Sequence, residues 1–361
     1  MENGSTTTPR YVLGLDLGDV ASALCLLEQG RDEPLERQQM PMEPEEVRGI
    51  LGALPRSLVV MEAGTHSPWV SRMAAELGHE VLVANPRQLA LITKSDRKTD
   101  RTDAETLARL ARADRSLLRP VRHREERLQR HLEVLRARDA LVRARTLLVN
   151  HARGALKGFG VRVNASSCDA FPQALRDQAP RELRALLAPV AQAIARLSTQ
   201  IAAYDRRVNE LCRKEHPETR RLQQVVGVGP VTSLAFVLTI ADPSRFGSNR
   251  QVGAYLGLRP RSAQSGASNR QLGIAKSGNP LLRRLLVQCA HHILGPFGPD
   301  TNLRRFGLAM RERGAGNAKK RAVVAVARRL AVLLLRLWRT GADYEPLYGA
   351  PPTPAVPAKA S

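Results

Sequence analysis

Three short apolar runs, separated by segments with helical spacing, constrain the fold of the first part of the chain. Tyr11–Leu15 and Ser57–Met61 are each followed by an acidic residue, and Glu80–Ala84 ends at an Asn-Pro pair. Between the last two runs, Trp69–Leu77 is apolar at helical spacing. Strands that alternate with helices pack as a sheet layered with helices. We therefore expect residues 11–117 to form an α/β domain.

A helical region is expected from residue 118 to residue 218. Glu125–Leu156 has helical spacing, and after Pro180 apolar residues recur in strict 4-3 alternation: Val190, Ile194, Leu197, Ile201, Tyr204, Val208 and Leu211. Such a seam is typical of a coiled coil, and we expect it to join copies of the chain into a dimer or tetramer. The alternative is a helical hairpin within one chain.

The third region, residues 219–345, is expected to be mainly α-helical. It contains a Gly227-Val-Gly229-Pro segment between two helical stretches. The segment is similar to a helix-hairpin-helix, in which backbone amides and a helix N-terminus hold a phosphate. A plain turn between helices is the structural alternative. The ends of the chain, residues 1–10 and 346–361, are expected to be disordered.

The charge balance indicates the class of partner. Lys and Arg number 56 against 34 Asp and Glu, which gives a formal net charge of +22 and favours a polyanion such as nucleic acid. No apolar run is long enough to span a membrane, so we expect a cytoplasmic, nucleoid-associated protein bound to DNA. The basic residues expected to contact nucleic acid are Arg259, Arg261, Arg270, Lys276, Lys319, Lys320 and Arg321.

Four acidic residues stand out in the first domain. Asp16 and Glu62 each end a predicted strand, and Asp100 and Asp103 are three residues apart at a predicted helix entrance. Open α/β sheets place their sites at the carboxyl ends of strands. Converging carboxylates require cations, and hard oxygen ligands suit Mg²⁺. Two such ions about 3.5–4 Å apart activate the attacking oxygen and stabilise the leaving oxygen in phosphodiester chemistry.

The order Asp, Glu, Asp-x-x-Asp, in strand, strand and helix contexts, resembles the RuvC-like, RNase-H-type nucleases. The Gly14-Leu-Asp16-Leu-Gly18 segment is also similar to the first phosphate loop of actin-like ATPases and sugar kinases. Those enzymes need a second Asp-Gly-Gly-Thr-type loop and a Gly-rich adenosine loop, and neither occurs in the sequence. The sequence therefore favours phosphodiester chemistry over kinase chemistry.

Serines in the Gly/Ser-rich segment of the third region are candidate nucleophiles. They lie among arginines and a lysine, a cationic setting that would position a phosphodiester and stabilise its transition state. A serine hydroxyl there could attack phosphorus and form a covalent phosphoseryl link. The residue types alone do not choose among Ser262, Ser265, Ser268 and Ser277.

The chain as a whole resembles the bacterial insertion-sequence transposases that join a RuvC-like Asp-Glu-Asp-Asp domain to a C-terminal serine transposase domain, the bridge-RNA-guided recombinases. The resemblance is carried by Lys98-Thr-Asp-x-x-Asp-Ala, by the Gly-Val-Gly-Pro segment, and by Tyr255-x-Gly-Leu-x-Pro through Ser265-Gly to Lys276-Ser-Gly-Asn.

The resemblance implies roles for single residues. It implies that Asp16, Glu62, Asp100 and Asp103 bind Mg²⁺, and that Ser265 is the nucleophile. It also implies a coiled coil between the catalytic domains, a multimer whose active site combines different subunits, and a noncoding bridge RNA that pairs with donor and target DNA.

Two other functions fit the same residues. One is a Holliday-junction nuclease that uses metal-activated water, with Ser265 structural. The other is a nucleic-acid-binding protein without catalytic activity. A recombinase is distinguished from both by a covalent protein–DNA intermediate.

Overall fold

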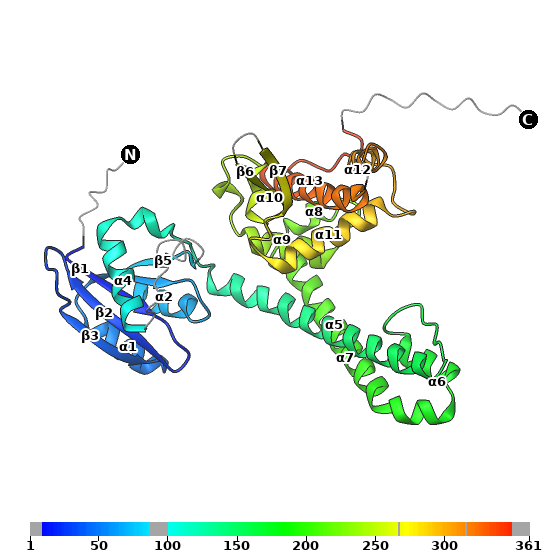
Figure 1. Ribbon diagram of the computed structural model, residues 1–361, viewed down its shortest axis with the longest axis horizontal. Helices are drawn as coiled ribbons and strands as arrows, with labels where there is room; N and C mark the ends of the chain where they lie inside the picture. Colours follow the sequence, from blue (N-terminus) through cyan, green and yellow to red (C-terminus); the bar gives the residue numbers. More distant parts are fainter. Residues whose placement is uncertain (1–8, 87–99, 266–267, 315, 349–361) are drawn as a thin grey trace, which may run out of the picture. The chain divides into compact units, whose positions relative to one another are not determined.

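The computed structural model describes residues 9–86, 100–265, 268–314 and 316–348, apart from the side chains of residues 100, 101 and 262–271 (Figure 1). The chain divides into two compact units, Met1–Arg124 and Glu125–Ser361, and each is treated by itself. Within the described residues, no helix combines the length and the apolar character needed to cross a bilayer.

The first unit is built on one five-stranded mixed sheet. Its strands are β1 (Tyr11–Asp16), β2 (Ala21–Glu28), β3 (Glu36–Pro41), β4 (Ser57–Glu62) and β5 (Glu80–Ala84), in the order β3-β2-β1-β4-β5. β1 is antiparallel to β2 and parallel to β4, and β4 is parallel to β5. The expected α/β class of this region is confirmed.

Helices cover both faces of this sheet (Figure 1). One face packs against α1 (Pro44–Ala53) and α2 (Ser67–Glu76), and the other against α4 (Asp100–Ala113), which a short 3₁₀ helix, η1 (Arg115–Leu118), follows. Alternate residues of each strand face opposite layers. On β1, Leu13 belongs to the α1/α2 core and Val12 to the α4 core.

Gly14 lets α4 lie directly on β1. A Cβ atom added at Gly14 would lie 2.0 Å from the carbonyl oxygen of Ala104 and 3.0 Å from the backbone nitrogen of Ala108. Both are backbone atoms of α4, so no side-chain rotation can make room. The close approach therefore fixes the first turn of α4 near the end of β1.

Gly14→Ala is expected to lower the free energy of unfolding of the first unit by at least about 2 kcal/mol, because α4 must move off the sheet. Urea unfolding followed by Trp69 fluorescence, in a Trp338→Phe background, measures this. The control is Gly49→Ala in α1, where an added Cβ meets nothing within 4 Å. The control is expected to be neutral or stabilising by up to about 1 kcal/mol. Equal stabilities of the two variants would contradict the role assigned to Gly14.

The second unit begins with a long helical hairpin. Its helices are α5 (Glu126–Gly158), α6 (Phe171–Gln178) and α7 (Arg181–Lys214). α5 and α7 are antiparallel: Arg138 pairs with Asp205, and Arg127 nearer the start of α5 pairs with Glu215 beyond the end of α7.

The predicted seam of α7 packs, where it is buried, inside the same chain. Ile194 shares a core with Val149 and Leu156 of α5, and Val208 and Leu211 share the next core with Leu132 and Leu135 of the same helix. Three predicted seam residues, Val190, Leu197 and Tyr204, are only half-buried. The arrangement corresponds to the intramolecular alternative, and assembly through this hairpin stays a prediction.

The rest of the second unit is mostly helical, as expected. Its elements are α8 (Thr219–Leu222), α9 (Pro230–Ile240), the 3₁₀ helix η2 (Pro243–Arg245), α10 (Gln251–Tyr255), β6 (Pro260–Ser265), β7 (Ser268–Ile274), α11 (Pro280–Leu294), α12 (Asn302–Glu312) and α13 (Ala318–Thr340). Residues 232–240 of α9 are all buried, so this helix forms the centre of the core that α11 and α13 complete.

Three parts of this region differ from what the sequence suggests. The Gly/Ser-rich segment, in which no strand was predicted, forms the antiparallel hairpin β6–β7. α8 is a single turn, so a full helix-hairpin-helix is not seen around Gly227. Pro346–Tyr348, expected within a disordered tail, form a turn held by Asn302, whose amide nitrogens donate to the carbonyls of Pro346 and Tyr348.

Candidate functional site

Asp16 and Glu62 lie at the same edge of the sheet. β1 and β4 are parallel, Leu15 pairs with Met61, and the next residue of each strand is the acidic one that ends it. Val12 and Gly14 face α4, as do Leu58 and Val60 on β4. Because strand side chains alternate, Asp16 and Glu62 occupy positions on that same face.

The start of α4 lies at this edge too. Ala104 sits against Gly14, whereas Ala111 lies beside Val12 and Leu58 near the beginnings of the strands. α4 therefore runs opposite to β1, and its first turn is next to the carboxyl ends of the strands. Asp100 begins α4, and Asp103, half-buried, precedes Ala104. The backbone thus brings all four predicted acidic positions to one edge and one face.

The fit of these residues to a metal rests on their chemistry and position. Carboxylates are the hard oxygen donors that Mg²⁺ prefers. Among the described side chains, which do not include that of Asp100, no three of His, Cys, Asp or Glu approach closely enough to hold a metal ion. The residues therefore fit Mg²⁺ in donor type, and their backbone positions share one edge of the sheet.

Glu105, two residues beyond Asp103, is committed to other partners. Its Oε2 accepts a hydrogen bond of 2.7 Å from Arg37, and its Oε1 accepts one of 2.8 Å from Arg109. Burial raises the pKa of the Glu105 carboxyl, but the hydrogen bonds from both arginines outweigh burial and leave it below its ordinary value. Glu105 therefore links α4 to β3. Because its carboxylate is held by two arginines, it can serve as a control for Asp103, the proposed metal ligand.

Sequence reasoning missed a polar cluster just after Glu62. The indole nitrogen of Trp69 donates to Nδ1 of His66 at 3.1 Å, which leaves the proton of His66 on Nε2, 3.1 Å from an Asp19 carboxylate oxygen. Beside it, the Ser67 hydroxyl lies 2.9 Å from Nε2 of His123. Burial, and then the charges of Arg72 and Arg124, lower the pKa of His123. The nearness of His66 and Ser67 to Glu62 in sequence is the only signal for this cluster.

Ser265 ends β6 in the second unit, where its backbone pairs with that of Ser268, the first residue of β7. The side chains of Ser265 and Arg270 lie outside the described residues. Arg259, Arg261 and Lys276 are exposed near the other end of the hairpin, called here the root.

Two glycines at the root of the hairpin pack directly against backbone atoms of the facing segment. Gly257 and Gly278 have φ angles of +69° and +78°. An added Cβ at Gly257 would lie 2.2 Å from the carbonyl oxygen of Ser277, and one at Gly278 would lie 2.1 Å from the carbonyl oxygen of Tyr255. Each position therefore requires glycine both for its conformation and for its space.

Side chains from α11 fasten the same root. Arg283 donates to the carbonyls of Leu256 at 3.1 Å and Ser277 at 2.8 Å, on opposite sides of the hairpin. Asn279 caps α11 by accepting from the amides of Leu281 and Leu282. The hairpin that carries Ser265 is thus fixed at its base to the core of the unit.

The Gly227-Val-Gly229 turn has two different halves. Gly227 has φ +82°, and an added Cβ would lie 3.2 Å from the His292 ring and 3.3 Å from the carbonyl oxygen of Cys289. Gly227 therefore serves packing against α11. An added Cβ at Gly229 would meet nothing within 4 Å, so this position, at the start of α9, leaves room for a ligand.

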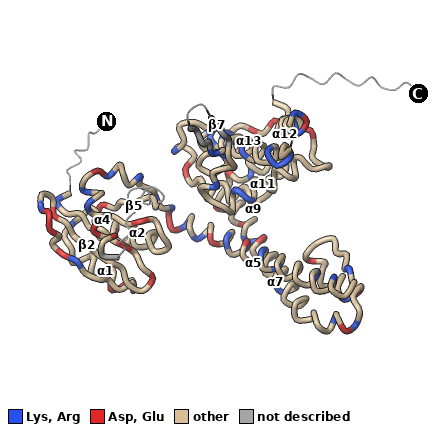
Figure 2. The backbone as a smooth tube through the Cα atoms, in the orientation of Figure 1, with Lys and Arg blue, Asp and Glu red and all other residues tan. Residues whose placement is uncertain are grey.

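Basic residues recur on α12 and α13 (Figure 2). Lys319, Lys320 and Arg321 are exposed in the first turn of α13. Arg328, Arg329, Arg336 and Arg339 follow, and α13 has no acidic residue.

Comparison with known protein families decides what kind of protein combines these two units. Residues 13–160 match the DEDD_Tnp_IS110 family, described as a transposase, and residues 219–302 match the transposase IS116/IS110/IS902 family. The chain belongs to the IS116/IS110/IS902 transposases. The match over residues 13–160 includes all four predicted acidic residues. The match over residues 219–302 includes the β6–β7 hairpin, its root and Ser265.

Whole-chain relatives agree with this membership. The chain is 29% identical to a Pseudomonas aeruginosa protein named "Probable family 20 transposase", over 92% of this chain and 98% of the relative. It is 30% identical to a Sinorhizobium fredii protein named "Putative transposase y4rJ", over 80% of this chain and 78% of the relative. It is 26% identical to the pilin gene-inverting protein of Moraxella bovis, over 80% and 81%. The chain is therefore a transposase, an enzyme that recombines DNA.

Proposed function

We propose that this transposase cuts and rejoins the DNA strands of its insertion sequence through a covalent phosphoseryl intermediate formed by Ser265. The observation that carries the proposal is the meeting of Asp16, Glu62 and the first turn of α4 at one edge of the sheet. The strand order β3-β2-β1-β4-β5 further supports the RuvC-like resemblance.

In the proposed reaction, the Ser265 oxygen bonds to phosphorus and the bond from phosphorus to the 3′ oxygen of the DNA breaks. The proton lost by the serine hydroxyl is balanced by the proton that the leaving 3′ oxygen takes up from water. A 3′ hydroxyl on the partner strand then reverses the linkage, so no external energy source is needed.

Asp16, Glu62, Asp100 and Asp103 would hold the Mg²⁺ ions. When bound, Mg²⁺ polarises the scissile phosphate and lowers the cost of its charged transition state. Arg259, Arg261, Arg270 and Lys276 on the hairpin, with Lys319, Lys320 and Arg321 and the Gly229 turn, would hold the DNA backbone.

The remaining parts of the proposal rest on the family resemblance. They are guidance by a bridge RNA that pairs with donor and target DNA, and assembly into a dimer or tetramer through the α5–α7 hairpin. In that assembly the carboxylates and Ser265 of one active site come from different subunits. The gene-inverting name of the Moraxella relative is in keeping with cutting and rejoining.

The test is to incubate the protein, purified with its copurifying RNA, with Mg²⁺ and DNA carrying the joined ends of the element. A DNA adduct that resists SDS is expected, with the DNA linked to the peptide that contains Ser265 when mapped by mass spectrometry. EDTA is expected to prevent the adduct. Strand cutting in Mg²⁺ without any adduct would instead identify a nuclease that uses water, and absence of both would overturn the proposal.

A further inference from the structure

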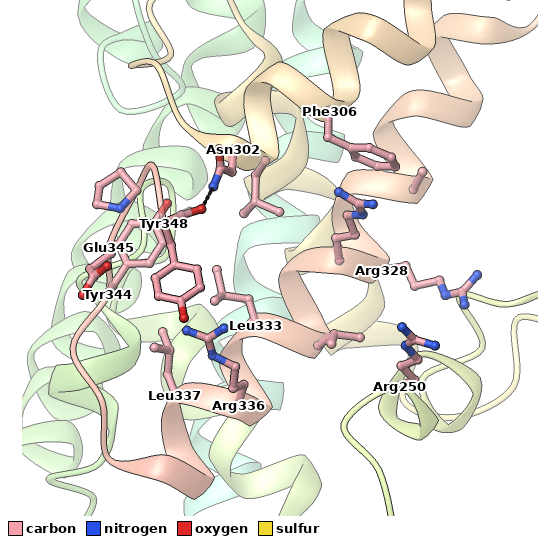
Figure 3. A pocket seen from close by; sticks show the side chains of 15 residues that line it. Arg250, Asn302, Phe306, Arg328, Leu333, Arg336, Leu337, Tyr344, Glu345 and Tyr348 are labelled. Carbon is pink, nitrogen blue, oxygen red and sulfur yellow. Dashed lines mark hydrogen bonds between the residues drawn. The ribbon is translucent and has the colours of Figure 1, made fainter. Parts of the chain in front are cut away.

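A pocket of about 580 Å³ lies in the second unit (Figure 3). Its lining contains no residue of the β6–β7 hairpin, and the proposed reaction does not use it. One face of α13 forms its floor, Phe306 of α12 and Arg250 before α10 form its sides, and Tyr344–Tyr348 close one end. The volume is within the range of roughly 300–1,000 Å³ that small-molecule sites occupy.

Four arginines line this pocket: Arg250, Arg328, Arg329 and Arg336. Within the described parts of the chain, none of the four forms a salt bridge with a carboxylate, whereas Arg138, Arg284 and Arg305 of the same unit do. Glu345 is the one acidic residue of the lining, and Figure 3 shows it beside Tyr344, at the opposite end from Arg250 and Arg328. The pocket is therefore a concentration of unneutralised positive charge.

Aromatic rings orient two of these arginines. The Arg329 guanidinium lies 3.5 Å from the centroid of Phe306, and that of Arg336 lies 5.1 Å from the centroid of Tyr348. Burial lowers the pKa of Arg329. A guanidinium that stacks through its flat face keeps its N–H donors in the plane, directed to the side. The stacks thus preorganise donors for an anion and offer a flat surface next to them.

Arg328 is positioned by packing instead. A Cβ added at Gly253 of α10 would lie 3.0 Å from Cγ of Arg328 and 3.4 Å from its Nε, so the stem of Arg328 crosses α10 at that glycine. Arg250 comes from the residue just before α10, and Figure 3 shows both arginines on the same side of the pocket. Guanidinium groups from two separate parts of the chain therefore line the same side of a pocket whose lining also includes the apolar side chains of Val332 and Leu333.

We propose that this pocket binds an unpaired nucleotide of a single nucleic-acid strand, with the phosphate held by Arg250 and Arg328 and the base against the Phe306–Arg329 stack. The inference deepens the proposed function, since it rests on nucleic acid as the substrate. Anion donors next to an aromatic stack are what a nucleotide requires. A duplex cannot occupy the pocket, because each of its bases is paired and stacked on both faces.

The test measures binding of fluorescein-labelled dT12 and rU12, and of a duplex of equal length, to the full-length protein by fluorescence anisotropy. Arg328→Gln is expected to weaken single-strand binding about 10-fold and to reduce the salt dependence by about one phosphate contact. Phe306→Leu is expected to weaken it about 5- to 10-fold, whereas Phe306→Tyr keeps the stack and the affinity. The matched control is Arg213→Gln, which removes one charge from the last turn of α7 and is expected to change affinity less than about twofold.

A loss of affinity for dT12 or rU12 that is larger than the loss for the duplex supports the inference. The strand whose affinity falls more shows whether the pocket prefers deoxyribose or ribose. Unchanged single-strand affinity in both Arg328→Gln and Phe306→Leu would overturn the inference, as would an equal loss for the duplex. Arg328 is exposed, so its variant remains informative even if Phe306→Leu does not fold. The SDS-resistant adduct is measured separately, so failure of the pocket and failure of the proposed function are distinguishable.

Discussion

Ser265→Ala is expected to abolish the SDS-resistant DNA adduct and to lower strand exchange at least about 10³-fold. The substitution removes the oxygen that we propose bonds to phosphorus, and loss of that nucleophile would close the covalent route altogether. DNA binding is expected to persist, since the basic residues of the hairpin and α13 are unchanged. Denaturing gels of the reaction with labelled element-end DNA measure both cutting and adduct.

Three matched serines of the same segment test the assignment. Ser262→Ala, Ser268→Ala and Ser277→Ala make the same chemical change on the hairpin or at its root. Each is expected to keep strand exchange within about twofold, because none of the three supplies the attacking oxygen in the proposed reaction. An adduct retained by Ser265→Ala and lost in one of these three would move the nucleophile to that serine. Cutting retained by Ser265→Ala, with no adduct, would favour the hydrolytic nuclease.

Asp16→Asn and Asp103→Asn are each expected to lower Mg²⁺-dependent cutting at least about 10²-fold. Each removes one negative charge and one oxygen from the proposed metal site, where a bound ion would supply several kcal/mol of transition-state stabilisation. Both variants are expected to need a higher Mg²⁺ concentration for half-maximal cutting. That shift separates a metal ligand from a residue that only supports the fold, and a titration of cutting rate with Mg²⁺ measures it.

The control for Asp103→Asn stands on the same helix. Glu105→Gln removes a carboxylate charge two residues away, but this carboxylate is held by Arg37 and Arg109. Because Glu105 fastens α4 from outside the proposed metal edge, we expect Glu105→Gln to leave the Mg²⁺ midpoint unchanged and the cutting rate within about threefold. Equal Mg²⁺ midpoints for Asp103→Asn and the wild type would exclude Asp103 as a ligand.

The sequence predicted the parts of the fold that carry a strong local pattern. β5 has the bounds Glu80–Ala84 that its apolar run indicates, and α7 extends through the whole predicted seam. β3 and α1 were not expected, because only Met40 of β3 is buried and a polar edge strand gives no apolar run. The β6–β7 hairpin was missed for a similar reason, since a polar two-stranded ribbon lacks the alternation that marks a half-buried strand.

The candidate site was predictable as a set of residues but not as an arrangement. Acidic residues after parallel strands indicate one sheet edge, which is why Asp16 and Glu62 are found together there. The arrival of α4 at that edge depends on backbone contact at Gly14, and no local pattern encodes such a contact. The arginine pocket depends in the same way on Arg250, Phe306 and α13 meeting from separate parts of the chain.

The two glycines at the root of the β6–β7 hairpin limit which sequence changes this part of the enzyme can tolerate. Neither Gly257 nor Gly278 can accept even a methyl group, so the direction in which the two strands project is closed to gradual mutational change. Outward positions such as Arg261 and Leu272 have no such restriction. A library built to alter DNA preference should therefore randomise those outward positions and leave the two glycines untouched.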